Sequence, residues 1–187
     1  FFLFSLTTYS QSLDSLRFIH PSGHTNWISS ISFSNNNKYI ATGSNDKTIR
    51  LWDLIYQKEL YSITKHTKTI RSVNFSPNDQ QIISSSFDNT VKVFDFNTGT
   101  EIHHFDFPNG CESAFFSPNG KFIITIVFNN KFKYEIHFYS SKNYELIYTI
   151  QVNSIIGNNF CFSNDGCFFA YAYKDSIAKV IELNHFN

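Results

Sequence analysis

Polar and apolar residues alternate with a period of two along several short segments of this chain. Residues 48–52 and 90–94 show the alternation over five positions each. This pattern is typical of β-strands that bury one face. Residues 122–128 form a continuous apolar run, which favours a strand covered on both faces. No segment combines helical periodicity with capping residues, so the pattern predicts an all-β protein.

Turn-forming residues separate these segments, and the composition agrees with the strand assignment. Short runs of Asn, Asp, Pro and Gly lie at 35–37, 77–79, 118–120 and 164–166. The chain holds 22 Phe and 10 Tyr but only 4 Pro. Aromatic residues are enriched in strands and Pro is excluded from them, which favours sheet.

Two parts of the chain repeat each other at a spacing of 42 residues. Residues in the first copy have counterparts of the same or similar type in the second: His24 and His66, Phe33 and Phe75, Asp46 and Asp88, Trp52 and Phe94. Two fainter copies follow, marked by Phe116 and Phe162. Self-similarity at such a fixed period predicts a repeat architecture, which usually presents surfaces for partners.

The copies predict how the chain is organised. We expect the end of a preceding unit at 1–23, clear repeats at 24–65 and 66–107, a degenerate repeat at 108–150, and a degenerate, incomplete one at 151–187. The third copy has Asn129 where the others have Asp. Its closing strand runs about four residues longer and ends near Tyr139.

These residues resemble the WD-repeat (G-beta-like) family of β-propellers. The family unit contains a Gly-His pair, a Ser-Pro turn, an Asp in a tight turn, and a closing Trp-Asp. The pairs Gly23–His24 and Trp52–Asp53 match it in the first copy, and Ser76–Pro77 in the second. The resemblance implies a partial β-propeller of about four four-stranded antiparallel blades.

The size of the ring follows from the chain length. Propellers have roughly 4–8 blades, and 187 residues hold about four and a half repeats, so we expect a fragment of a longer propeller. The missing blades would then be needed for closure. The alternative is a closed four-bladed ring in which residues 13–19 complete the last blade beside 176–181.

The resemblance also implies a buried polar network in each repeat. Its members are His24, Thr42, Asp46 and Trp52 in the first repeat, and His66, Ser84, Asp88 and Phe94 in the second. Phe94 has no N–H, so the second network lacks its last donor. The counterparts are Phe107, Thr125, Asn129 and Tyr139 in the third repeat, and Asn153, Tyr171, Asp175 and Ile181 in the fourth. Neither of these has the His, and we expect apolar packing there instead.

Charge gives little support to nucleic-acid binding. The chain has 15 basic and 15 acidic residues and a formal net charge of zero. Nucleic-acid-binding domains usually carry a basic excess. Basic residues do outnumber acidic ones within residues 38–71. These basic side chains are either solvated surface or a patch for an anionic partner. An RNA-associated component of a ribonucleoprotein complex is therefore the alternative function.

The sequence predicts neither a metal nor another cofactor. Cys111, Cys161 and Cys167 lack metal-ligand spacing, and we expect reduced packing residues, as in a cytoplasmic or nuclear protein. Residues 1–6 are too short to span a membrane, and we expect no membrane association.

The titratable residues of the repeats are better explained by structure than by catalysis. His24, His66, Asp46 and Asp88 occupy equivalent places in two repeats, and the chain has no phosphate-binding loop and no nucleophile elbow. We therefore predict a protein that is not an enzyme.

A scaffold that binds protein or peptide partners through loops on one face is the first hypothesis. The resemblance assigns the candidate partner-binding residues to the loops beside the networks: Trp27, Asn45, Thr69, Arg71 and Phe87. Trp27 is a plausible interface anchor, although an aromatic residue here can equally pack between blades.

Overall fold

The computed structural model describes residues 23–129, 134–152, 160–173 and 177–183. Every regular element in these residues is a β-strand. The strands are β1 (Ile28–Phe33), β2 (Tyr39–Ser44), β3 (Ile49–Asp53), β4 (Lys58–Ile63), β5 (Ile70–Phe75), β6 (Gln81–Ser86), β7 (Thr90–Asp95), β8 (Glu101–Asp106), β9 (Cys111–Phe116), β10 (Phe122–Phe128), β11 (Tyr134–Ser140), β12 (Leu146–Val152), β13 (Phe160–Phe162), β14 (Phe168–Tyr173) and β15 (Ile177–Glu182).

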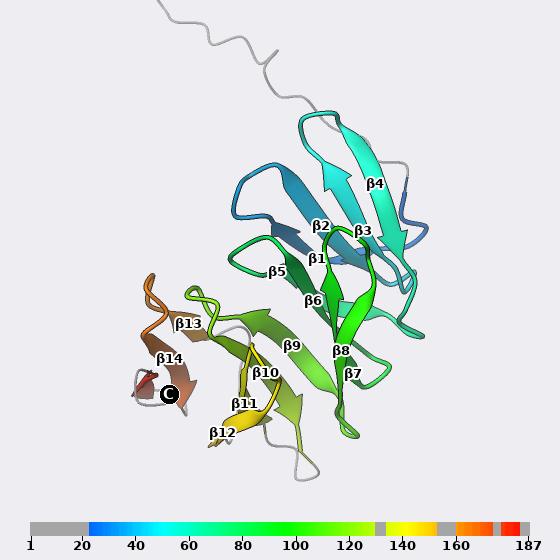
Figure 1. Cartoon of the computed structure of the whole chain (residues 1–187). Helices are drawn as coiled ribbons and strands as arrows, with labels where there is room; N and C mark the ends of the chain where they lie inside the picture. The colour runs from blue at the N-terminus through cyan, green and yellow to red at the C-terminus, as the bar shows by residue number, and fades with distance from the viewer. Residues whose placement is uncertain (1–22, 130–133, 153–159, 174–176, 184–187) are drawn as a thin grey trace, which may run out of the picture.

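The strands form four separate antiparallel sheets, which we call blades. Strands β1–β4, β5–β8 and β9–β12 each form a four-stranded meander, and β13–β15 form a sheet with three described strands. The blades follow one another along an open arc, from the blue and cyan first blade to the orange and red fourth (Figure 1). The predicted all-β fold and partial propeller are therefore confirmed. Three strands of the fourth blade lie within the described residues, and the residues after 183 lie outside them.

Two expectations from the sequence concern residues that the structure does not describe. The end of a preceding unit at 1–23 falls almost wholly outside the described residues. The same is true of residues 13–19, which would complete a closed four-bladed ring.

Apolar side chains fill the spaces between successive blades. Ile49 and Leu51 of β3 share a buried cluster with Ile70 and Val73 of β5. Comparable clusters lie between the second and third blades and between the third and fourth. Each fully buried side chain of this size contributes about 1.5–3 kcal/mol through the hydrophobic effect. Blade-to-blade packing is therefore the main source of stability.

The apolar run of β10 is explained by its position in the third blade. Ile123 belongs to the cluster shared with the second blade, whereas Ile124 belongs to the cluster shared with the fourth. Successive side chains of a strand point to opposite faces, so both faces of β10 are covered.

Polar side chains connect the innermost strands of neighbouring blades. The Ser30 hydroxyl accepts a hydrogen bond from Val73 N–H at 3.0 Å, and the Ser72 hydroxyl accepts one from Ala114 N–H at 3.1 Å. Ser30 and Ser72 are equivalent, 42 residues apart. A buried edge strand would otherwise leave backbone donors unpaired. Each serine therefore satisfies a backbone group of the next blade.

One turn position is the same in all four blades. Asn37, Asp79, Gly120 and Gly166 follow the first strand of their blades and have φ values of +59°, +59°, +70° and +69°. Gly, Asn and Asp are the residues that best tolerate this left-handed conformation. The turn chemistry predicted from the sequence therefore has a conformational cause.

Candidate functional site

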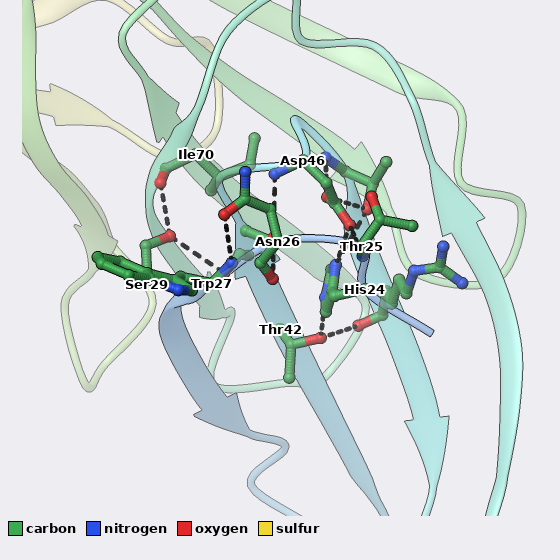
Figure 2. Close-up of polar contacts among 12 residues, drawn as sticks. His24, Thr25, Asn26, Trp27, Ser29, Thr42, Asp46 and Ile70 are labelled. Atoms are coloured by element: carbon green, nitrogen blue, oxygen red, sulfur yellow. Dashed lines mark hydrogen bonds and ion pairs between the residues drawn. The ribbon is translucent and has the colours of Figure 1, made fainter. Parts of the chain in front are cut away.

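The first repeat ties its entry loop to the β2–β3 turn through His24. The ring Nδ1 lies 2.8 Å from the Asp46 carboxylate, and Nε2 lies 2.7 Å from the Thr42 hydroxyl. Trp52 Nε1–H donates to the same hydroxyl at 2.9 Å. Figure 2 shows His24 between Asp46 and Thr42. The four residues that the resemblance pointed to are thus brought together as one chain of hydrogen bonds.

The Asp46 carboxylate is the centre of this network. It accepts hydrogen bonds from His24, from Thr25 N–H at 3.0 Å, and from both the N–H and the hydroxyl of Thr48, at 3.0 and 2.7 Å. Burial alone would raise the pKa of Asp46, but these donors outweigh it and hold the pKa well below its usual range. The carboxylate therefore stays ionised and joins the loop to the turn.

The second repeat has the same arrangement without the indole. His66 Nδ1 lies 2.8 Å from Asp88, and Nε2 lies 2.8 Å from the Ser84 hydroxyl. Phe94 is fully buried at the position of Trp52 and supplies no donor. Burial lowers the pKa of His66, and donors from Thr90, Thr67 and His66 overcome burial to lower the pKa of Asp88 to about 2. The pair is therefore a neutral imidazole and a carboxylate.

The third repeat replaces the network with polar contacts on a single strand. Phe107 is buried, as expected from apolar packing. However, Glu135, His137 and Tyr139 of β11 form a chain, with His137 Nε2 at 3.0 Å from Glu135 and Nδ1 at 3.1 Å from the Tyr139 hydroxyl. The expected apolar packing is present, because Phe107 and Tyr139 belong to one buried apolar cluster, and the polar contacts of β11 are added to it. The alternation of polar residues at 135, 137 and 139 was the available signal.

The fourth repeat is described only in part. Asn153 and Asp175 lie outside the described residues. Tyr171 is buried, and Ile181 packs against the same apolar cluster.

Four of the five predicted partner-binding residues form two equivalent pairs. Asn45 N–H donates to the Trp27 carbonyl at 2.9 Å, and Phe87 N–H donates to the Thr69 carbonyl at 2.9 Å. In each blade the loop before the first strand therefore lies beside the turn between the second and third strands. The antiparallel topology places all four residues at the same end of the blades.

Exposure distinguishes the two aromatic candidates from core residues. The Trp27 residue is 81% exposed and Phe87 is 51% exposed. Figure 2 shows the Trp27 ring directed away from His24 and the network. Within the described residues Trp27 is therefore exposed, and its packing against a preceding blade would involve residues outside the described part.

Arg71 connects the second blade to the third at this end. Its guanidinium lies 4.3 Å from the centre of the Phe87 ring and 5.8 Å from that of Phe128, and it forms an ion pair with Glu112 of β9. Cation–π contacts of this kind contribute about 0.5–2 kcal/mol. Sequence reasoning missed Glu112 and Phe128, which lie on the neighbouring blade.

The described residues contain no cluster of three or more His, Cys, Asp or Glu side chains placed to hold a metal ion. The same residues contain no helix long and apolar enough to cross a membrane. The three cysteines are unbridged, with Cys111 buried and Cys161 exposed.

Comparison with known proteins points to the same repeats. Residues 14–53 and 57–95 match the family model described as "WD domain, G-beta repeat". Ribosome biogenesis protein YTM1 of Scheffersomyces stipitis is 46% identical over 44 residues, which is 23% of this chain and 9% of that protein. Nuclear distribution protein PAC1 of Candida tropicalis is 45% identical over 42 residues, which is 22% of this chain and 9% of that protein. Each match therefore covers about one repeat.

Proposed function

We propose that this chain, whose residues 14–53 and 57–95 match WD repeats, is a non-catalytic scaffold for protein or peptide partners. Partners would bind the blade end that holds Trp27, Asn45, Thr69, Arg71 and Phe87. One observation carries the proposal: Trp27 is 81% exposed on a loop that the His24 network holds in place.

An exposed aromatic residue on a rigid loop suits an interface anchor. Trp, Tyr and Arg dominate the binding energy of protein interfaces, and a fixed side chain loses little entropy when a partner covers it. The Arg71–Phe87 pair has the same character, because the ring and the guanidinium already hold each other. Trp27 on the first blade and the Arg71–Phe87 pair on the second therefore supply a preformed surface.

The polar residues of the repeats support a binding role over catalysis. The side chains of His24 and His66 are only 4% and 1% exposed. Their ring nitrogens are engaged by Asp and hydroxyl partners within the blades, so they hold the loops rather than face a substrate.

The relatives support a role in larger assemblies. Their names refer to ribosome biogenesis and to nuclear distribution, which also supports an intracellular place for this chain. Since the matches span only 9% of each relative, the identity of a partner does not follow from them.

The RNA alternative has weaker support from the geometry. Arg50 pairs with Glu59 at 2.7 Å, and Arg71 pairs with Glu112. Two of the basic residues within 38–71 are therefore neutralised by carboxylates. Salt-sensitive RNA binding that disappears on substitution of Lys47 and Lys68 would favour this alternative.

An affinity pull-down from source cells, with matched variants, tests the scaffold proposal. Trp27→Ala and Phe87→Ala should each reduce partner recovery at least tenfold while the β-sheet circular dichroism spectrum stays unchanged. Tyr56→Ala is the control, because Tyr56 is 73% exposed on the β3–β4 turn at the opposite end of the blade. Equal recovery by all three variants would reject this binding face.

A further inference from the structure

A cavity of about 710 Å³ lies at the loop end of the third blade. Its walls come from the loop after β8, the end of β10, and strands β11 and β12. The lining residues on which the inference depends are Asp106, Phe107, Asn129, Glu135, His137 and Gln151. In the first two repeats an imidazole of the entry loop joins the loop to the turn at the equivalent place. In the third repeat that loop residue is Phe107, which forms no such bridge.

Glu135 is the main polar group of the cavity wall. One carboxylate oxygen accepts from Gln151 Nε2 at 2.7 Å and from Asn129 Nδ2 at 3.3 Å, and the other lies 3.0 Å from His137 Nε2. An ionised carboxylate has about four acceptor positions. The contacts within the described residues use three of these, which leaves capacity for one more donor.

The charges around the cavity favour a cation. Hydrogen bonds from His137 and Gln151 lower the pKa of Glu135, so this carboxylate is ionised at neutral pH. Asp106 adds a second carboxylate, whose side chain is 75% exposed and lies 3.9 Å from His104 Nε2. The lining contains no Lys or Arg within the described residues. Arg71, which approaches Phe128 of the lining, is neutralised by its ion pair with Glu112.

The aromatic side chains of the lining complete a site for a basic side chain. Phe107, Phe128 and Tyr139 also line the cavity. Ammonium and guanidinium groups bind favourably to aromatic faces and to carboxylates, and their aliphatic stems pack on apolar surface. An anionic group would face two carboxylates instead.

We propose that this cavity receives the cationic side-chain group of a lysine or arginine from a protein partner. The inference rests on the proposed scaffold function, because it specifies the chemistry of the partner. It also places part of the interface on the third blade, next to the Arg71–Phe87 pair. Asp106 attracts the cation at the rim, and Glu135 accepts a hydrogen bond from it inside.

Titration of the full chain with a small probe, followed by NMR, tests this directly. The probe is Nα-acetyl-lysine amide, and the neutral comparison is Nα-acetyl-norleucine amide. We expect saturable shifts of the His137 ring resonances and of the backbone amides of residues 106–109 with the lysine probe and no such shifts with the norleucine probe. Nα-acetyl-arginine amide should produce the same pattern.

Variants separate the site from general surface charge. Asp106→Asn, on the exposed rim, should weaken the lysine probe about threefold or more, and Glu135→Gln should weaken it more strongly. Glu145→Gln is the control, because Glu145 is exposed on the β11–β12 turn away from the lining and should leave binding unchanged.

Three results would overturn the inference: equal shifts with the norleucine probe, no shifts near His137 with either basic probe, or the same shifts with inorganic phosphate. The proposed function is tested separately, because Trp27→Ala should retain probe binding while losing partner recovery. Probe binding in that variant supports the cavity whatever the pull-down shows.

Discussion

Asp46→Ala should be among the most destabilising single substitutions in the first blade. It removes four hydrogen bonds, accepted from His24, from Thr25 N–H and from two groups of Thr48. Each hydrogen bond contributes about 1 kcal/mol net, and neighbouring losses do not add fully. We therefore expect a loss of about 3–4 kcal/mol in the free energy of unfolding. This is a large share of the about 5–15 kcal/mol that folded domains possess.

Urea denaturation followed by circular dichroism measures this loss. Asp46→Asn is the second variant, because its amide N–H₂ faces the donors of His24 and Thr25 and cannot accept from them. It should be nearly as destabilising as the Ala variant. Asp106→Ala is the control, since its side chain is 75% exposed, and it should change stability by less than about 0.5 kcal/mol. A midpoint for both Asp46 variants equal to that of the control would refute the role of the network.

Three further predictions concern single groups. Trp52→Phe removes the 2.9 Å hydrogen bond to Thr42 and part of a buried ring, and it should cost about 1–3 kcal/mol in urea denaturation. A cost above that of Asp46→Ala would contradict the central place of Asp46 in the network. The pKa of His66 is lowered from 6.5 by burial, so the unfolded chain binds more protons and stability falls as pH drops below about 6.5. Thermal melts from pH 7 to pH 5 should show this decline, with a smaller slope in His66→Gln, whereas an unchanged slope would argue against a buried neutral imidazole. Burial raises the pKa of the Cys111 thiol to about 12. A thiol reagent should therefore modify exposed Cys161 at once and Cys111 only on unfolding. Rapid modification of both thiols would show that the second and third blades are not packed.

The sequence was sufficient to predict the fold because its signals are local and repeated. Alternation in residues 48–52 and 90–94 marks strands that the structure shows as β3 and β7. The 42-residue spacing placed His24 and Asp46 in one unit, and the structure joins them at 2.8 Å. The alternation and the spacing predicted strands and repeats, whereas the propeller arrangement and the His24–Asp46 contact were implied by the resemblance to WD repeats.

The contacts that the sequence did not predict depend on positions of neighbouring strands. Glu135 meets Gln151 because the β11–β12 register places them opposite each other. Arg71 meets Glu112 across two blades, 41 residues apart, and only the packing of β5 against β9 brings them together. The third repeat also lacks the His and Asp that made the first two recognisable, so no template indicated where its polar groups would lie.

The hydrogen bonds that Ser30 and Ser72 accept from the next blade affect which substitutions a repeat tolerates. The hydroxyl of Ser30 or Ser72 recognises only a main-chain amide of the following unit, which every residue except proline provides. A repeat can therefore change side chains that do not pack against its neighbours and still keep this contact with the preceding repeat. Residues 108–150 lack the His and the Asp of the first two repeats, yet their innermost strand is still held by Ser72 through Ala114 N–H.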